Sequence, residues 1–147
     1  MRPVPSVQKQ LRVSVGDLHE ALGRLELLQP INARTGSVHA AAWAVPGNGI
    51  QLVREDVGRH NALDKAIGAL IQAKADFGAG YMIITSRASY EMVQKSATAG
   101  VALLAAVSAP TALAIRTAER AGVTLVGFAR RDRHVVYTHP ERLTVGP

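Results

Sequence analysis

The sequence predicts an α/β fold, a three-layer sandwich in which helices cover both faces of a mostly parallel β-sheet. Two observations predict it. A leading β-hairpin is followed by regular alternation of strands and helices, and the later strands are short, almost wholly apolar runs. Such alternation favours parallel strands joined by crossover helices, and continuous apolar runs are typical of strands buried on both faces. We expect one domain, residues 14–147, preceded by an arm, residues 1–13.

The first predicted helix begins with Ser14 as its N-cap, and Asp17 three residues later completes a capping-box pattern. Pro30 ends it. Apolar residues recur at helical spacing and define the face that should be buried: Val15, Leu18, Ala21, Leu22, Leu25 and Leu28. The hairpin follows, because a strong turn signal separates two runs of strand length. The two runs and their turn are Val38–Val45, Ile50–Val53 and Pro46–Gly49.

The most polar stretch of the chain, Arg54–Lys65, lies between an apolar strand and an apolar helix. Gly58 is expected to take a positive φ or to allow a close approach, and His60 or Asn61 is expected to cap the helix. Two interpretations stay open. The stretch is either a salt-bridged helix start or a site for an anion at a helix N-terminus, and we favour the site.

Three further apolar runs are predicted as buried strands: Tyr81–Thr85, Val101–Val107 and Thr124–Phe128. The helix after the first run ends at Gly100. The helix after the second has Ser108 as its N-cap, Pro110 in its first turn and Gly122 at its end. The chain then continues with a basic turn and an edge strand, Ala129–Arg133 and Val135–Tyr137.

Polar residues follow the strands of this predicted sheet. Four such segments fall on its carboxyl edge: Glu55–His60, Thr85–Ser89, Ser108–Thr111 and Phe128–Arg133. Ligands of open α/β sheets bind at that edge. Helix-start amides, hydroxyl groups and guanidinium groups suit a phosphate or pyrophosphate. The hydroxyl and guanidinium candidates are Ser86, Ser89, Ser108, Thr111, Arg87, Arg130, Arg131 and Arg133.

The acidic residues of the edge allow more than one interpretation. Asp56 or Asp64 can accept hydrogen bonds from a guanine edge or a ribose hydroxyl. A metal site with His60 is a second possibility, but pairing with neighbouring cations is favoured over it. Those cations are Arg54, Arg59 and Lys65. For the arginines of the basic turn, the alternative to a site is a solvated turn.

The composition narrows the functional classes. The chain has 147 residues, a formal net charge of +6 and a hydrophobic fraction of 48%, of which little is aromatic. Positive charge attracts phosphates and nucleic acids, but the arginines form no basic tail. The chain contains no cysteine, which excludes disulfides, thiolate chemistry and cysteine-ligated zinc on these residues. Met1–Gln10 lacks a signal-peptide pattern and no run is long enough to span a membrane, so we expect a cytoplasmic location.

Several motifs together resemble one family. The stretch Glu55–Lys65, with the sequence EDVGRHNALDK, is similar to the signature of the formate dehydrogenase accessory sulfurtransferases. The remaining motifs follow in the family's order: Thr35–Ala41, Ser86–Glu91, Ser108–Thr111, Phe128–Arg130 and Val136–Thr138.

The resemblance implies a function and a fold. Members of this family take sulfur from a cysteine desulfurase, carry it as a persulfide, and pass it to the molybdenum or tungsten bis-guanine-dinucleotide cofactor. The cofactor, molybdenum bis-molybdopterin guanine dinucleotide in the first case, is then inserted into formate dehydrogenase. The resemblance further implies a cytidine-deaminase-like fold and a homodimer. We expect the cofactor as a transient client and a guanine nucleotide as its mimic, with no zinc, no nucleic acid and no membrane.

The resemblance also implies a cofactor-binding surface that coincides with the polar edge. Its expected members are Thr35, Gly36, His39, Asp56, Gly58, Arg59, His60, Asn61, Asp64, Lys65, Ser86, Arg87, Ser89, Ser108, Ala109, Pro110, Thr111, Phe128, Ala129, Arg130, Arg131, Asp132 and Arg133.

The chain departs from the family pattern in three places. Ser37 and Ser86 stand where the family has glycine. Serine restricts the backbone conformation that glycine permits in both loops. The family's Cys-x-x-Cys loop is missing, and in the family it precedes the helix that matches residues 14–28 here. We therefore expect a carboxyl-terminal domain that binds the cofactor but is inactive in sulfur transfer by itself.

Two hypotheses from other classes are weaker. A zinc-dependent deaminase needs cysteine and histidine ligands with a glutamate as proton shuttle, and Asn61 follows His60 where that glutamate is wanted. A non-enzymatic module that binds guanine nucleotides or RNA is favoured by the net charge. The scarcity of aromatic residues for base stacking argues against single-strand binding.

Overall fold

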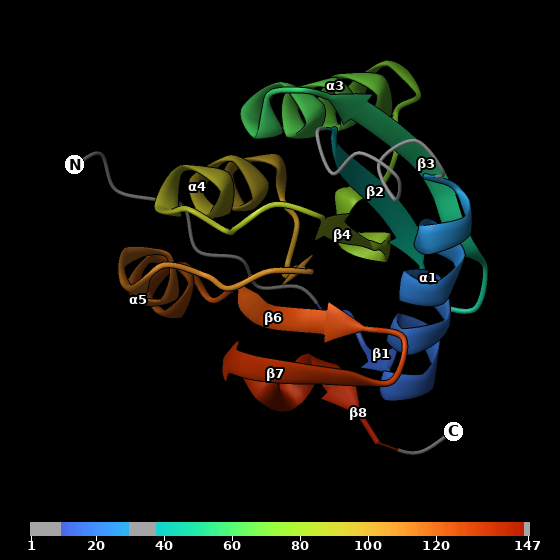
Figure 1. The fold of residues 1–147 in the computed structure, drawn as a ribbon. Coiled ribbons are helices and arrows are strands. Elements are labelled where there is room, and N and C mark those ends of the chain that lie inside the picture. The colour runs from blue at the N-terminus through green and yellow to red at the C-terminus, as the bar shows by residue number, and fades with distance from the viewer. Residues whose placement is uncertain (1–9, 30–37, 146–147) are drawn as a thin grey trace.

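The computed structural model describes residues 10–29 and 38–145, which form a six-stranded sheet between two layers of helices (Figure 1). The strand order is β3-β2-β4-β5-β6-β7. Their bounds are β2 (His39–Val45), β3 (Gly49–Asp56), β4 (Tyr81–Ile84), β5 (Leu103–Ala106), β6 (Thr124–Arg130) and β7 (Arg133–Thr138). The hairpin strand β2 and the edge strand β7 run against the other four. The predicted α/β sandwich with its leading hairpin is confirmed, and the likeness to cytidine deaminases stays a prediction.

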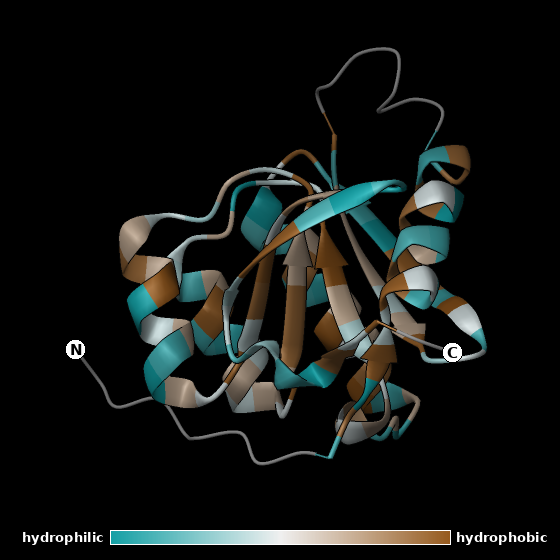
Figure 2. Ribbon diagram, turned by 90° about the horizontal axis from the view of Figure 1, so that it is seen from below, coloured by the Kyte–Doolittle hydropathy of each residue, from teal (hydrophilic) through white to brown (hydrophobic). Residues whose placement is uncertain are grey.

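In the part of the chain that the structure describes, α1 (Val15–Leu27) covers one face of the sheet. The other face is covered by α3 (Arg59–Gln72), α4 (Tyr90–Ala99) and α5 (Ala112–Ala121) (Figures 1 and 2). Helices α3, α4 and α5 share a face because the crossovers from β3 to β4, to β5 and to β6 all advance in one direction, with the same hand. Helix α1 crosses the opposite face and contacts both β3 and β6.

Small apolar side chains fill the core. Strands β4 and β5 are buried along their whole length, as their unbroken apolar runs predict. Leu11 and Val13, from the segment predicted as an arm, are also buried in this core. Short elements complete the fold: β1 (Val13–Ser14) pairs in parallel with β8 (Leu143–Thr144), and the two 3-10 turns are η1 (Phe77–Ala79) and η2 (Pro140–Arg142).

The start of α1 agrees with its prediction in part. Ser14 is the N-cap, and its hydroxyl accepts a hydrogen bond from the Asp17 N–H at 3.0 Å. The Asp17 carboxylate accepts instead from the Gly47 N–H at 2.9 Å and from the Tyr81 hydroxyl at 2.7 Å. Burial, with the Asp17 charge beside it, raises the pKa of Tyr81 well above its usual range. Asp17 therefore locks α1 to the hairpin and the sheet instead of completing a capping box.

Two predicted N-caps are wrong. Helix α3 is capped by Gly58, not by His60 or Asn61, and the Gly58 carbonyl accepts from the Ala62 N–H at 3.0 Å. The φ of Gly58 is −96°, so a positive φ is not the reason for a glycine here. The reason is a close approach, because a Cβ at this position would lie 3.1 Å from the side chain of Asn61.

Helix α5 is capped by Thr111, not by Ser108, and Pro110 lies before the helix. The reason is a parallel bridge between Pro110 and Ala88, which keeps the chain extended beyond the end of β5.

The basic turn is shorter than predicted. Strand β6 continues to Arg130 and β7 begins at Arg133, so only two residues turn. Between the pairs Gly127–Val135 and Arg130–Arg133, β6 has one residue more than β7, and Phe128 adopts a left-handed φ of +49° there. A bulge of this kind bends a strand and redirects its side chains.

Candidate functional site

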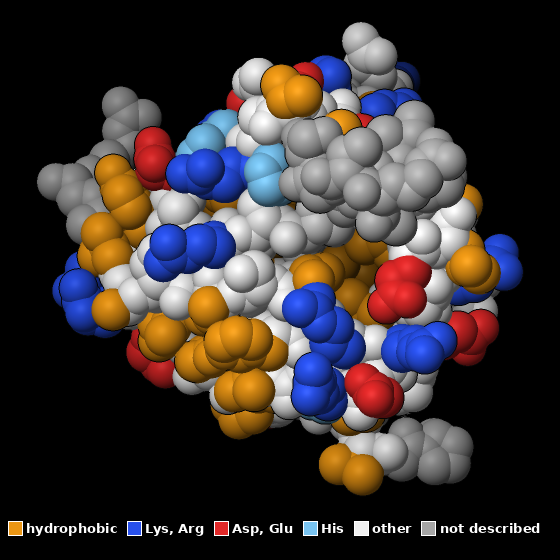
Figure 3. Space-filling view, viewed as in Figure 1, with side chains coloured by type: hydrophobic (Ala, Val, Ile, Leu, Met, Phe, Trp, Pro, Cys, Tyr) orange, Lys and Arg blue, Asp and Glu red, His pale blue; other side chains and the backbone are white. Residues whose placement is uncertain are grey.

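A cavity of about 450 Å³ opens at the carboxyl ends of β4, β5 and β6, beneath the last turns of α1. Figure 3 shows it as a hollow with an apolar floor and charged groups on its rim. Its size is that of a small-molecule site. It is lined by Leu22, Leu25, Glu26, Leu27, Gln29, Thr85, Val107, Ala129 and Arg130.

The sheet supplies one wall of this cavity. Thr85 and Val107 directly follow β4 and β5, and Ala129 and Arg130 end β6. Parallel strands end at the same edge, so these residues come together as the sequence predicts. Of the residues predicted for the site, Ala129 and Arg130 line the cavity.

Helix α1 supplies the other wall, which sequence reasoning missed. Its apolar stripe passes through Leu18, Leu22 and Leu25, and Gln29 takes the next position on that stripe. Gln29 is only 4% exposed, and its Nε2 donates to the Glu55 Oε2 at 3.2 Å. In the sequence, the signal for this wall is Gln29, a polar residue at the next position of the apolar stripe.

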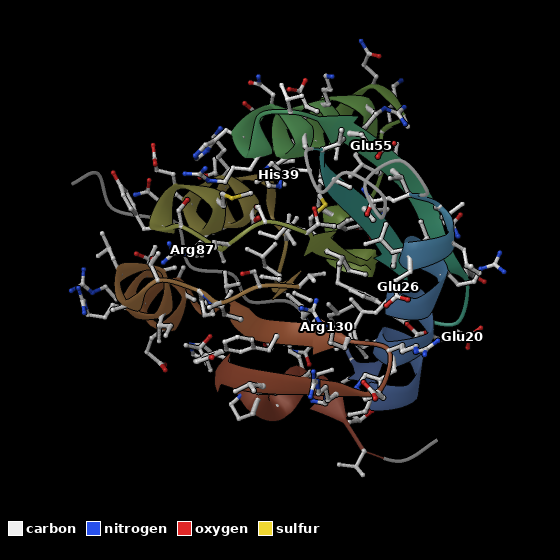
Figure 4. The ribbon with its side chains drawn as sticks, viewed as in Figure 1. Glu20, Glu26, His39, Glu55, Arg87 and Arg130 are labelled. Atoms are coloured by element: carbon white, nitrogen blue, oxygen red, sulfur yellow. The ribbon has the colours of Figure 1, made fainter. Side chains whose placement is uncertain are left out.

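Two opposite charges face each other across the mouth of the cavity. Glu26, on α1, and Arg130, at the end of β6, lie on opposite sides of the hollow (Figures 3 and 4). Both side chains are exposed, and no ion pair joins them within the described residues. This arrangement suits a ligand with a flat apolar body, hydrogen-bond donors at one end and negative charge at the other.

The loop after β5 is joined both to the loop after β4 and to the end of β6. The Thr111 N–H donates to the Ala88 carbonyl at 3.0 Å, and the Phe128 N–H donates to the Ser108 carbonyl at 3.2 Å. A Cβ on Gly127 would lie 2.7 Å from the Pro110 Cδ. Three of the predicted segments of the polar edge therefore form one connected surface.

Several hydroxyl groups on this surface are occupied within the protein. The buried Ser86 hydroxyl donates to the Arg87 carbonyl at 3.1 Å. Ser89 and Thr111 cap α4 and α5 by accepting from backbone N–H groups. Their role in the structure as described is to shape the loops.

Both aspartates that follow Glu55 in the central stretch form ion pairs with lysines. Asp56 ends β3, and its carboxylate lies 2.7 Å from the Lys65 Nζ and accepts from the Gly58 N–H at 2.9 Å. The hydrogen bond from Lys65, followed by that from Gly58, lowers the pKa of Asp56. Asp64 lies 3.0 Å from the Lys95 Nζ. These pairs connect α3 to β3 and to α4.

The remaining predicted residues lie elsewhere on the same edge or beyond it. His39 pairs with Asp56 across the hairpin, and the His60 Nε2 lies 3.9 Å from a Glu91 carboxylate oxygen. Exposed side chains follow: Arg59, Asn61, Arg87, Phe128, Arg131, Asp132 and Arg133. Ala109 is half-buried in the loop after β5. Thr35 and Gly36 lie outside the described residues.

Two general features of the described residues bear on function. They contain no group of three or more histidine and acidic side chains placed to hold a metal ion. None of their helices is long and apolar enough to cross a membrane.

The fold and the cavity define an α/β domain with a cavity of small-molecule size at the carboxyl edge of its sheet. Comparison with known proteins then identifies the family: a model of the FdhD/NarQ family matches residues 1–144, and the chain belongs to that family. A sulfur carrier protein FdhD from Xanthomonas euvesicatoria pv. vesicatoria is 58% identical over 146 residues, 99% of this chain and 52% of the relative. One from Cupriavidus necator is 56% identical over 126 residues, 86% of this chain and 44% of the relative.

The chain thus spans about half the length of the curated relatives it matches. A crystal structure of a protein assigned as a formate dehydrogenase accessory protein, from Desulfotalea psychrophila, has the same fold. It superposes with a TM-score of 0.86 at 28% identity and covers 95% of this chain and 62% of that chain. The predicted family is confirmed.

Proposed function

We propose that this domain binds one guanine nucleotide arm of the molybdenum or tungsten bis-guanine-dinucleotide cofactor while that cofactor is sulfurated for formate dehydrogenase. The observation that carries the proposal is the apolar cavity between α1 and the ends of β4–β6, with Arg130 on its rim. Leucine, valine and alanine side chains suit the faces of a purine ring, and a guanidinium group suits a phosphate.

The size of the cavity favours binding of one nucleotide arm of the cofactor. A volume of about 450 Å³ suits one nucleotide, and the complete cofactor with its two dinucleotide arms is far larger. A homodimer would offer one cavity to each arm. Exposed apolar side chains outside the cavity, such as Val57 (76% exposed) and Ile71 (60% exposed), are available for contact with a second copy.

The chemistry of sulfur transfer lies outside these residues. The chain has no cysteine, so it contributes binding and orientation, and the persulfide is carried on another part of the protein or on another chain. In this proposal a cysteine desulfurase supplies the sulfur, formate dehydrogenase receives the finished cofactor, and both exchanges take place in the cytoplasm.

Calorimetric titration with guanosine diphosphate tests the proposal. Arg130→Ala should weaken binding by about 1.5–3 kcal/mol, the range for a hydrogen bond to a charged group. Arg120→Ala is the matched control, because it removes the same charge from the last turn of α5, on the other face of the sheet. Equal losses in both variants would show that net charge alone attracts the nucleotide. Tighter binding of an oligonucleotide, strongly weakened by salt, would favour the RNA-binding alternative.

A further inference from the structure

We infer that Glu26, in the last turn of α1, selects guanine over other bases in the α1 cavity, an inference that rests on the proposed function. The carboxylate would accept hydrogen bonds from the N1–H and the 2-amino group of the base. Glu26 is an exposed carboxylate on the rim of an otherwise apolar cavity. Nothing in the signature motifs of the sequence points to it.

The position of Glu26 supports this role. It lies on the side of the cavity opposite Arg130, and the described residues give it no cationic partner (Figure 4). A carboxylate with free lone pairs accepts two hydrogen bonds side by side. A ligand bound with its phosphate near Arg130 and its ring over the apolar floor would present its far edge to Glu26.

The neighbouring contacts keep this wall in place. Gln29, three residues after Glu26 and just beyond the end of α1, is almost fully buried and donates a hydrogen bond from its Nε2 to Glu55. The Lys65 Nζ in turn donates to the Glu55 carbonyl at 3.1 Å. The end of α1 is therefore tied to β3 and α3 before a ligand arrives, which lowers the cost of ordering it on binding.

The chemistry of the bases gives the selectivity. Guanine presents two adjacent donors, N1–H and the 2-amino group, to which a carboxylate is complementary. Hypoxanthine keeps N1–H but lacks the amino group. Adenine presents an acceptor at N1, which a carboxylate repels. A site built to accept hydrogen bonds discriminates strongly against a ligand that leaves it unpaired.

The test is a titration of the whole chain with guanosine, inosine and adenosine diphosphates by calorimetry. The unmodified protein should bind the three in that order, with guanosine diphosphate at least about tenfold tighter than adenosine diphosphate. Glu26→Gln should weaken the binding of guanosine diphosphate by about tenfold. The binding of adenosine diphosphate should stay unchanged or become slightly tighter. Glu20→Gln is the matched control: it makes the same change on α1 but outside this cavity, and should change none of the three affinities.

The outcomes separate the inference from the proposed function. If guanosine diphosphate binds and Glu26→Gln weakens all three nucleotides equally, or none of them, the inference is overturned and the proposed function stands. If no nucleotide binds to the unmodified protein, both are overturned. A circular-dichroism melting curve for each variant shows whether it is folded, and Glu26→Asp, which keeps the charge, should retain the order of the three nucleotides.

Discussion

Gln29 donates a hydrogen bond from its Nε2 to the Oε2 of Glu55 at 3.2 Å and so joins the end of α1 to the end of β3. Glu55 belongs to the most polar stretch of the chain, but it lines no part of the cavity itself. Its contact with Gln29 is the described link between that stretch and the cavity wall. The central stretch therefore supports the cavity wall through Glu55, and its Asp56 and Lys65 pair with each other.

Removing this link should weaken the wall. Glu55→Ala leaves the Gln29 amide without its acceptor, so we expect a loss of unfolding free energy of about 1 kcal/mol, because Glu55 itself is exposed. The affinity for guanosine diphosphate should fall at the same time. Urea denaturation and calorimetry measure the two effects. Glu20→Ala is the control, because Glu20 is an exposed glutamate on α1 outside this cavity, and an equal effect of both changes would contradict the role given to Glu55.

Two glycines should respond to alanine in opposite directions. A Cβ at Gly127 would lie 2.7 Å from the Pro110 Cδ and 2.8 Å from the Tyr137 Cε2, so Gly127→Ala should destabilise the protein by about 1–3 kcal/mol. A Cβ at Gly68, inside α3, would meet nothing within 4 Å. Gly68→Ala should therefore stabilise the protein by about 0.5–1 kcal/mol through helix propensity. Thermal denaturation of the pair checks both signs, and a stabilising Gly127→Ala would show that the loop after β5 is not packed on β6.

The layers of the fold and the polar edge could be predicted from local sequence. Alternating apolar runs and helices fix which strands are parallel, and parallel strands bring the loops after β4, β5 and β6 together. The cavity could not be predicted in this way. Its second wall depends on where α1 crosses the sheet, and that is set by long-range contacts such as Asp17 with Tyr81 and with Gly47.

The wrong N-caps have the same cause. Ser108 precedes a proline and has the residue type of an N-cap, which favours a helix start on local grounds. The bridge between Ala88 and Pro110 keeps the chain extended until Thr111, a contact between loops that are far apart in the sequence. Tertiary contacts of this kind override local propensity, and local sequence reasoning does not include them.

The chain should not accept sulfur. Incubation with a cysteine desulfurase and radiolabelled cysteine should leave no label on this polypeptide in a non-reducing gel, because none of its side chains can form a persulfide. A longer relative that contains a Cys-x-x-Cys loop serves as the positive control. Label retained on this polypeptide would contradict the proposal that the chain binds the cofactor while the persulfide is carried elsewhere.

A pair of histidines should make the stability of the protein depend on pH near neutrality. The His19 Nε2, on α1, lies 2.9 Å from the His134 Nδ1, on β7. Burial, with the nearby His19, lowers the pKa of His134 below its usual value. The unfolded chain then binds more protons than the folded one between the folded pKa of His134 and its normal value of about 6.5, so the unfolding free energy rises with pH across that window.

The full contribution is present above about pH 6.5 and is lost as the pH falls through the folded pKa of His134. Melting temperatures measured between about pH 7.5 and pH 5.5 should therefore decrease toward acid, in a range above the titration of ordinary carboxylates. His134→Gln should flatten this dependence, because glutamine keeps hydrogen-bonding capacity but does not titrate. His60→Gln is the matched control, since His60 lies at the start of α3 and contacts Glu91 instead. The role of the pair is contradicted if the slope survives His134→Gln and is lost in His60→Gln.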